Sequence, residues 1–381
     1  MKLAELGQRI EELRGVQLLR EPDDGLIREE MERVFGARFV DAASNDYLDL
    51  AGLREAEAGD LPRGAGASRL VFGTHEPHLL VEREAAAWLG FDAALYFSTG
   101  YAANVGALGA LLSKEDAVFS DQLNHASLID GIRLSGARAR VFAHLDLADL
   151  ESQLAHASQA SARWVVAESY YSMDGDGPDL PRLATLCREY DAHLYIDEAH
   201  AVGTFGEGGR GLCAEQKVKP DVLVAAFGKA VGAQGACVLG TRELRIWLWN
   251  RARSFVFSTA PSPRVAASVR AQMGRAQSAQ DERERLRERT LQFRQLLAEG
   301  GAPLVPGSFG PIVSVVLGEA EQALSCADRL RSWGILAQAI RPPTVAAGQC
   351  RLRLVLRSSM SEKQVRDLAT AVLQASETVR R

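Results

Sequence analysis

Apolar and polar positions in the middle of the chain follow two periods, one typical of strands and one typical of helices. Short apolar runs predict strands, and amphipathic stretches at helical spacing fall between most of them. This alternation indicates an α/β fold with a parallel or mixed sheet covered on both faces. The expected strands are Ala93–Phe97, Ala117–Ser120, Ala139–Phe142, Trp164–Glu168, His193–Ile196, Val222–Ala226 and Ala236–Leu239.

The two ends of the chain follow other patterns. Residues 3–19 have apolar positions near helical spacing and predict an amphipathic arm. Residues 264–299 predict a long polar helical stretch, followed by a smaller α+β arrangement. We therefore expect a helical arm with a short strand segment (1–50), a large cofactor-binding domain (51–262) and a small C-terminal domain (263–381). The C-terminal elements expected are strands near Ile312–Leu317, Ile335–Ile340 and Leu352–Leu356, with helices over 319–332 and 361–379.

Composition narrows the class of protein. The chain has 381 residues, 47% hydrophobic and 24% charged, which suits a globular protein of more than one domain. A formal net charge of −5 argues against a nucleic-acid partner, and no apolar run reaches the roughly 20 residues of a membrane span. The charged N-terminus is unlike a signal peptide. Five scattered cysteines without a CxxC pattern indicate reduced thiols, so we expect a cytoplasmic protein.

One lysine has an unusual setting. Lys229 follows the expected strand Val222–Ala226 and is the only one of six lysines with apolar and glycine neighbours on both sides. Loss of solvation there makes an amine easier to deprotonate and able to attack a carbonyl. Another expected strand leads to Asp197, three residues before His200. A Schiff-base lysine with a strand-end aspartate under the pyridinium nitrogen is the pair that a pyridoxal 5′-phosphate site needs.

Two segments after expected strands carry further candidates. Ser98–Asn104 follows a strand and opens a helix, and amides at a helix N-terminus attract anions such as phosphate. Taken alone, an ordinary β–α turn explains this segment equally well. His125 follows the next strand, where an imidazole could stack on a flat ring, although a lone histidine is more often structural.

Other polar clusters admit more than one interpretation. Asp174 and Asp176 resemble a metal loop but lack the later carboxylates of a calcium site, so a tight turn is favoured. His75 and His78 have no third ligand at suitable spacing, and we expect no metal. Arg341 precedes two prolines on a rigid, extended segment that suits a carboxylate clamp, while a solvated surface arginine is equally compatible.

Together these segments resemble the α-oxoamine synthases, pyridoxal-phosphate enzymes of fold type I, the aspartate aminotransferase fold. The likeness runs nearly end to end and in order. It implies a large domain with a mostly parallel seven-stranded sheet and a smaller α+β C-terminal domain. The matching segments are Ser44–Tyr47, Gly66–His78, Ser98–Asn104, His125–Leu128, Ser172–Asp176, Asp197–His200, Gly209–Gly211 and Phe227–Lys229.

The resemblance implies roles for the cofactor site. Lys229 would hold the cofactor as a Schiff base and later move protons, and Asp197 would pair with the pyridine nitrogen. His200 would contact the ring hydroxyl or polarise the substrate carbonyl. His125 would stack on the ring, and Ser172 would support the side of the ring that carries the hydroxyl. The amides of Gly100 and Tyr101 would hold the phosphate.

The resemblance also implies substrate contacts and a partner. Asn45 and Arg341 would orient the amino-acid carboxylate, with Arg20 as a further substrate contact. Thr259 would reach the phosphate from a second copy of the chain, because dimeric members of this fold share sites, so we expect a homodimer. Ala226 departs from the family, which commonly has a hydroxyl residue three positions before the lysine. One hydrogen bond to phosphate is therefore expected to be missing.

The implied reaction condenses an amino acid with an acyl thioester, with loss of CO2 and a free thiol. Segments 216–229 and 339–354 most resemble family members of biotin biosynthesis, which favours L-alanine with a pimeloyl thioester of coenzyme A or a carrier protein. Glycine or serine with another acyl thioester is the first alternative. An aminotransferase or lyase on the same fold is the second, and its product would distinguish it. A non-enzymatic binding protein is the third, which the full set of candidate residues disfavours.

Overall fold

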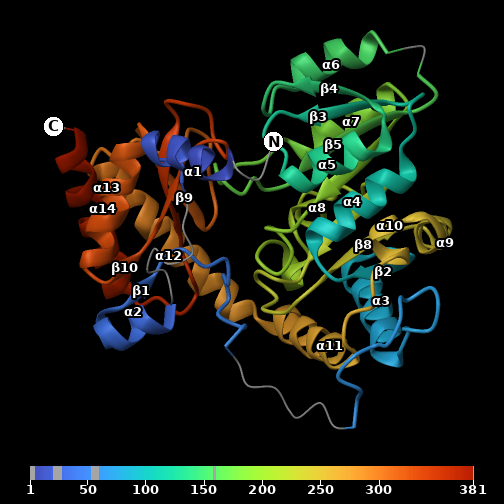
Figure 1. Cartoon of the computed structure of the whole chain (residues 1–381), viewed down its shortest axis with the longest axis horizontal. Coiled ribbons are helices and arrows are strands. Elements are labelled where there is room, and N and C mark those ends of the chain that lie inside the picture. The colour runs from blue at the N-terminus through green and yellow to red at the C-terminus, as the bar shows by residue number, and fades with distance from the viewer. Residues whose placement is uncertain (1–4, 20–27, 53–59, 158–159, 381) are drawn as a thin grey trace. The chain divides into compact units, whose positions relative to one another are not determined.

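A computed structural model describes residues 5–19, 28–52, 60–157 and 160–380 (Figure 1). The chain divides into two compact units. The larger comprises Asp46–Ser172 and Asp176–Glu284, and the smaller comprises Met1–Asn45, Met173–Gly175 and Arg285–Arg381. Within the described ranges, no helix combines the length and apolar character needed to cross a membrane.

A seven-stranded sheet forms the centre of the larger unit, in the order β2-β8-β7-β6-β5-β3-β4. β8 is antiparallel to both of its neighbours, and the other neighbouring pairs are parallel. The mostly parallel seven-stranded sheet expected for the fold is therefore confirmed. The strands are β2 (Ala93–Phe97), β3 (Ala117–Asp121), β4 (Arg138–Phe142), β5 (Arg163–Glu168), β6 (Ala192–Asp197), β7 (Val222–Ala226) and β8 (Ala236–Gly240).

Both faces of this sheet are covered. All residues of β2, β3, β7 and β8 are buried, which explains why these strands are nearly continuous apolar runs. The edge strand β4 is mostly exposed and carries two arginines, which discourage pairing with another sheet. The helices of the unit are α3 (Glu76–Leu89), α4 (Gly100–Leu111), α5 (Ala126–Ser135), α6 (Leu147–Ala155), α7 (Leu180–Glu189), α8 (Leu212–Glu215), α9 (Arg242–Arg251), α10 (Arg253–Val256) and α11 (Pro263–Ser278).

The smaller unit contains an antiparallel sheet in the order β11-β12-β9 and a short parallel pair of β1 with β10. The strand expected over 335–340 is thus split between two sheets. Every residue of β12 is buried, including Arg353, which donates to Asn45 Oδ1 at 2.8 Å. The elements are α1 (Leu6–Gly15), α2 (Arg28–Phe35), β1 (Val40–Asp41), β9 (Ile312–Gly318), α13 (Ala320–Ser332), β10 (Ile335–Leu336), β11 (Gln338–Ile340), β12 (Cys350–Val355) and α14 (Glu362–Arg380).

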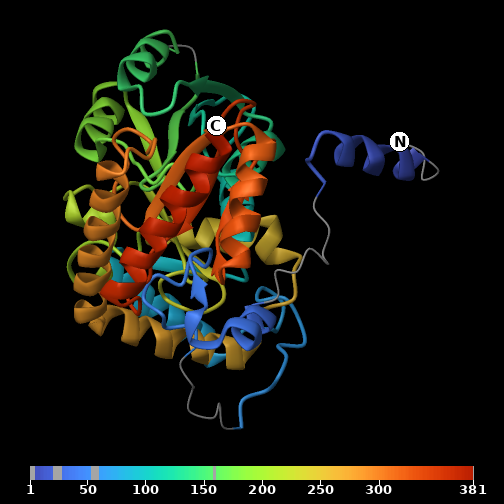
Figure 2. The ribbon, with the colours of Figure 1, turned by 90° about the vertical axis from the view of Figure 1, so that its left-hand side faces the viewer.

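The N-terminal helix α1 presents apolar side chains to solvent. Leu6, Ile10 and Leu13 follow helical spacing, yet they are 37%, 42% and 44% exposed. Figure 2 shows α1 extending away from the other elements of its unit. The expected amphipathic arm is therefore a helix, but its apolar side is not a buried face.

The helical stretch expected over 264–299 is interrupted at Ala279, where α11 is followed by α12 (Gln280–Glu299). The side chain of Arg283 stabilises the break. Its guanidinium donates to the carbonyl oxygens of Ala276 at 2.6 Å and Gln277 at 3.1 Å. These are terminal carbonyls that α11 cannot satisfy internally.

The position of α11 also decides where the two units divide. α11 packs against α3, and Gln272 donates to the carbonyl oxygen of Leu50 at 2.8 Å. The division into compact units falls inside α12, between Glu284 and Arg285, and the expected domain boundary after residue 262 stays a prediction.

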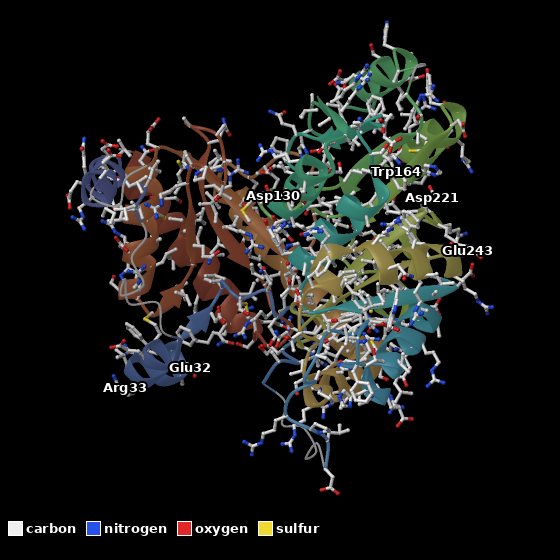
Figure 3. The ribbon with its side chains drawn as sticks, turned by 45° about the vertical axis from the view of Figure 1, so that its right-hand side comes forward. Glu32, Arg33, Asp130, Trp164, Asp221 and Glu243 are labelled. Atoms are coloured by element: carbon white, nitrogen blue, oxygen red, sulfur yellow. The ribbon has the colours of Figure 1, made fainter. Side chains whose placement is uncertain are left out.

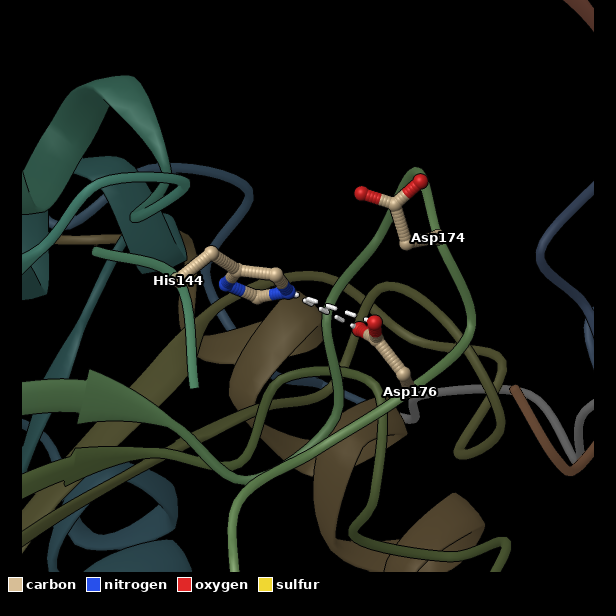
Figure 4. A group of neighbouring side chains, drawn as sticks. All are labelled: His144, Asp174 and Asp176. Carbon is tan, nitrogen blue, oxygen red and sulfur yellow. Dashed lines mark hydrogen bonds and ion pairs between the residues drawn. The ribbon is translucent and has the colours of Figure 1, made fainter. Parts of the chain in front are cut away.

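The half-buried side chain of His144 links β3 to the turn after β5. His144 Nδ1 lies 2.8 Å from Asp121 Oδ1. On the other side of the ring, Nε2 lies 3.2 Å from Asp176 Oδ2, as Figure 4 shows. Burial lowers the pKa of His144, but the hydrogen bonds to Asp121 and Asp176 outweigh this effect and raise the pKa to about 9. Gly175 adopts a φ of +68° between the two aspartates, in keeping with the expected tight turn. Asp176 thus acts as a partner of an imidazolium.

Candidate functional site

The carboxyl ends of several strands meet at one edge of the large sheet. β5, β6 and β7 are parallel, and β2 runs in the same direction because β8 is antiparallel to both β2 and β7. Segments that follow such strands lie close together and commonly form a ligand site. A cavity of about 340 Å³ lies there, within the range of small-molecule sites. Its lining is Thr99, Gly100, Tyr101, Asn104, His125, Ser127, Glu168, Asp197, Ala199, His200, Ala226, Gly228, Lys229, Ala233, Gln234 and Gly235.

Lys229 is placed by the tight loop that joins β7 to β8. Phe227 N donates to Gly235 O, and Gly232 N donates to Lys229 O, both at 2.8 Å. Gly232 has a φ of +70°, and a Cβ there would stand 2.5 Å from the amide nitrogen of Ala51. Only glycine allows the loop to pass so close to its neighbour. The loop thereby holds the half-buried Lys229 side chain in the cavity wall.

Asp197 ends β6, and its carboxylate is held at both oxygens. Oδ2 accepts a 2.6 Å hydrogen bond from Asn104 Nδ2, and Oδ1 accepts a 2.7 Å hydrogen bond from the backbone of Ala199. The residue is buried apart from its contact with the cavity. Asn104 is a partner that sequence reasoning missed, although it stands inside the Ser98–Asn104 segment.

The first turn of α4 forms an anion seat. Thr99 caps the helix, with its hydroxyl oxygen accepting from Ala102 N at 3.0 Å. The amides of Gly100 and Tyr101 have no partner within the helix, and the helix dipole adds partial positive charge. A Cβ on Gly100 would stand 3.4 Å from the Ala226 Cβ, so residue 226 borders this seat.

The Tyr101 side chain has a different partner from its amide. Its hydroxyl donates to Asp130 Oδ2 on α5 at 2.6 Å, and Asp130 is labelled in Figure 3. This bond ties the first turn of α4 to α5. The amide of Tyr101 is thus the group that suits the implied phosphate role.

His125 caps α5 from the cavity wall. Its backbone N donates to Glu168 Oε1 at 2.6 Å, and its Nδ1 accepts from Ser127 N at 3.2 Å. Partial burial lowers the pKa of His125; the charge of Asp197 opposes this effect and the charge of Lys229 adds to it. A neutral imidazole on the cavity wall suits stacking on an aromatic ring.

His200 is fixed by a tyrosine far away in the sequence. The hydroxyl of Tyr47 and Nδ1 of His200 lie 2.7 Å apart and share a hydrogen bond, and Tyr47 is fully buried. The bond fixes the orientation of the imidazole through Nδ1. The Ser44–Tyr47 segment was the only sequence signal for this partner.

Glu168 is a cavity residue that the sequence analysis did not select. It ends β5 and is the register partner of Asp197 on β6, so two carboxyl groups lie side by side. Burial raises the pKa of Glu168 well above its ordinary value, and the charge of Asp197 adds to the rise, while the His125 amide opposes it. Its strand-end position, like that of Asp197, was the available signal.

The other predicted site residues lie elsewhere. Ser172 is half-buried and Thr259 forms a β-bridge with Ser68, and neither lines the cavity. Ser172 lies in the turn that follows β5, where Tyr171 N donates to Asp176 O at 2.8 Å. Three predicted substrate residues are not tested by this cavity. Asn45 and Arg341 belong to the smaller unit, and Arg20 lies outside the described residues.

The residues of the cavity fit pyridoxal phosphate. The cavity holds an amine for its aldehyde, a fixed carboxylate for its pyridine nitrogen and helix amides for its phosphate, from Lys229, Asp197 and the start of α4. Each of these protein groups can bind or react with the functional group of the cofactor that it is paired with. His125 adds a flat ring in the same wall.

Comparisons with known proteins point to one family. The model of "Aminotransferase class I and II" matches residues 38–372. An 8-amino-7-oxononanoate synthase of Alkalilimnicola ehrlichii is 42% identical over 348 residues, covering 89% of this chain and 88% of that protein.

Solved structures agree with the family match. A serine palmitoyltransferase from S. paucimobilis with a bound PLP–myriocin aldimine aligns with a TM-score of 0.86 at 27% identity, over 90% of this chain and 88% of that one. The 8-amino-7-oxononanoate synthase of Francisella tularensis aligns with a TM-score of 0.78 at 27% identity, over 90% and 99%.

Glu168 provides a test of the cavity electrostatics. Because the folded-state pKa is raised, the neutral acid stabilises the fold at low pH, and this stability is lost as pH rises above the unfolded value of 4.5. Glu168→Gln keeps a neutral acceptor for the His125 amide. In the cofactor-free protein, we expect the variant to gain free energy of unfolding relative to the wild type. The gain should be larger at pH 8 than at pH 5 by on the order of 1 kcal/mol.

Urea unfolding at both pH values measures this difference. Glu288→Gln, on the exposed side of α12, is the matched control and should change neither value. An identical pH dependence in the Glu168→Gln and wild-type proteins would show that Glu168 is ionised in the fold.

Proposed function

The chain belongs to the aminotransferase class I and II family and, within it, to the α-oxoamine synthases, and on this premise we propose that it condenses L-alanine with a pimeloyl thioester. The products are 8-amino-7-oxononanoate, CO2 and a free thiol, in biotin biosynthesis. The protein is a pyridoxal-phosphate-dependent acyltransferase of fold type I, so the expected family, fold and cofactor are confirmed.

One observation carries the proposal. A lysine, an aspartate and two histidines with the chemistry of this reaction line one cavity, in a chain 42% identical to a protein named 8-amino-7-oxononanoate synthase. The cavity supports the class of reaction. The names of the curated relatives support the choice of alanine and pimeloyl thioester.

Each of the chain's own groups would have a separate role in this reaction. Bound pyridoxal phosphate supplies an electron sink that stabilises negative charge on the amino-acid Cα. Lys229 Nζ would hold the cofactor covalently and then take and return the α-proton. The Asp197 carboxylate would keep a proton on the ring nitrogen, since an adjacent opposite charge favours the protonated form. His200, oriented by Tyr47, would donate from Nε2 toward the ring hydroxyl or the substrate carbonyl.

The proposed reaction joins the alanine Cα to the carbonyl carbon of the thioester. The carbon–sulfur bond breaks and the thiol leaves, the carboxyl group leaves as CO2, and a proton takes its place on Cα. We propose that Asn45 and Arg341 orient the alanine carboxylate and that Arg20 contacts substrate. Arg353 supports the first role, because its hydrogen bond to Oδ1 fixes the Asn45 amide.

The direct test of the proposed function is thiol release over a grid of amino acids and acyl thioesters. We expect L-alanine with pimeloyl-coenzyme A or its carrier-protein form to be the preferred pair, with CO2 and thiol in equal amounts. Lys229→Ala is the control and should abolish turnover. Preference for serine or glycine with another thioester would replace the proposed substrates, and formation of a keto acid without thiol would contradict the reaction class.

We also propose a homodimer whose two copies share each cofactor site. The bridge between Ser68 and Thr259 joins a loop and a segment with exposed aromatic side chains, Phe72 at 87% and Phe257 at 73%. Exposed apolar groups of this size are typical of an interface. Thr259 lies on the same bridge, which supports its proposed reach to the partner's phosphate.

Mixing two inactive variants tests the shared site. Lys229→Ala removes the lysine of one copy, and Thr259→Asp repels phosphate in the other. Hybrid dimers contain one intact site, so we expect denaturing and refolding the two together to restore activity that neither shows alone. A fully active monomer in analytical ultracentrifugation would refute the proposal.

We place the enzyme in the cytoplasm. All five cysteines are buried thiols that form no disulfide. Persistent thiols suit a reducing compartment. Cell fractionation followed by immunodetection tests this location.

Ala226 predicts an affinity gain. Because residue 226 borders the anion seat, Ala226→Thr should add a hydroxyl donor to the cofactor phosphate. A hydrogen bond to a charged group stabilises by about 1.5 kcal/mol or more, so we expect roughly tenfold tighter binding. Dialysis and reconstitution measure the dissociation constant.

Ala226→Val is the matched control, since valine has the shape of threonine without the hydroxyl. It should bind no more tightly than the wild type. Equal affinity of the threonine variant and the wild type would mean that another donor already makes this hydrogen bond to the phosphate. Thr259 of the second copy is the candidate.

A further inference from the structure

A single buried amide connects two residues of the cofactor cavity. Asn104, on α4, donates from Nδ2 to Asp197 Oδ2 at 2.6 Å and to Ser127 Oγ at 2.9 Å. Its Oδ1 accepts from the hydroxyl of Tyr195 at 2.9 Å. The opposite orientation of the amide would set Oδ1 against the Asp197 carboxylate, two acceptors with no proton between them. The chemistry of the partners therefore fixes the orientation of the amide.

The same network sets the protonation of His125. The backbone N–H of Ser127 can only donate, and it lies 3.2 Å from His125 Nδ1, so that nitrogen is the acceptor. Ser127 Oγ accepts from Asn104 and lies 2.7 Å from the same Nδ1, to which its own proton is directed. His125 thus carries its proton on Nε2 and is neutral.

Neutral His125 matters because charged groups surround it. Asp197, Lys229 and Asp130 act electrostatically on the ring, and Glu168 holds its backbone amide. An imidazolium here would compete with the cofactor's ring nitrogen for the charge of Asp197. A neutral amide donor can restrain both residues without adding a charge to the cavity.

We propose that Asn104 is a positioning residue that orients the Asp197 carboxylate toward the cofactor nitrogen and, through Ser127, holds His125 in its neutral Nε2-protonated form. This inference rests on the proposed function for its catalytic meaning. It assigns to Asn104 a role that is exerted through Asp197 and Ser127. A structural role alone would affect stability and leave cofactor affinity and the His125 ring unchanged.

The primary variant is Asn104→Leu, which has nearly the same shape and no donor. Loss of a hydrogen bond to a charged carboxylate predicts a rise of roughly 10- to 100-fold in the dissociation constant for pyridoxal phosphate. In the cofactor-free protein, nitrogen-15 NMR of the seven histidines should show His125 losing its single Nε2-protonated form, with His125→Gln identifying the signal. The turnover number should fall more than KM changes.

Two further variants distinguish the effect of Asn104 on Asp197 from its effect on His125. Ser127→Ala should alter the His125 ring signals while leaving cofactor affinity within about twofold of the wild type, because the Asn104–Asp197 bond remains. Asn104→Asp keeps the shape of the side chain but adds a second carboxyl beside Asp197, so affinity should be weaker at pH 8 than at pH 6. This variant keeps the test valid if Asn104→Leu does not fold.

The control is Gln272→Leu, which removes a buried amide that donates to Leu50 O outside the cavity. It should lower stability without changing either readout. Wild-type cofactor affinity and His125 signals in both folded Asn104 variants would overturn the inference. These readouts need no substrate, so they stand apart from failure of the substrate grid.

Discussion

The parallel pairing of β5, β6 and β7 is the constraint on which the whole site depends. It brings Glu168 and Asp197 into register and places the Lys229 loop beside them, although these residues are distant in the sequence. Reversing any of these strands would carry its last residue to the opposite edge of the sheet. The order and direction of the strands therefore determine which residues meet in the cavity.

Two neighbouring carboxyl groups at this edge have different surroundings. Burial raises the pKa of Glu168 well above its ordinary value, while Asp197 receives hydrogen bonds at both oxygens from Asn104 and Ala199. The fixed carboxylate of Asp197 is the one that suits a protonated pyridine nitrogen opposite it. α4 contributes at two levels, since its first amides suit phosphate and its fifth residue restrains the carboxylate.

The sequence was sufficient to predict the cavity residues that follow the end of a strand. Lys229, Asp197 and His125 follow apolar runs, and their position in the cavity follows from a parallel sheet. Their partners were not predictable, because the Tyr47–His200 and Asn104–Asp197 bonds join positions 153 and 93 apart. The helix break at Ala279 was missed for another reason: the side chain of Arg283 satisfies the broken end from no more than seven residues away, and the period of apolar positions does not reveal such a contact.

Borohydride reduction of the cofactor-loaded protein, followed by peptide mapping, tests the central claim most directly. The cavity contains one lysine, and the account predicts that pyridoxal phosphate becomes fixed to Lys229 alone among the six lysines of the chain. The reduced protein should lose activity in proportion to that label. Stoichiometric label on another lysine, or full activity after Lys229 is modified, would contradict the assignment of this cavity as the active site.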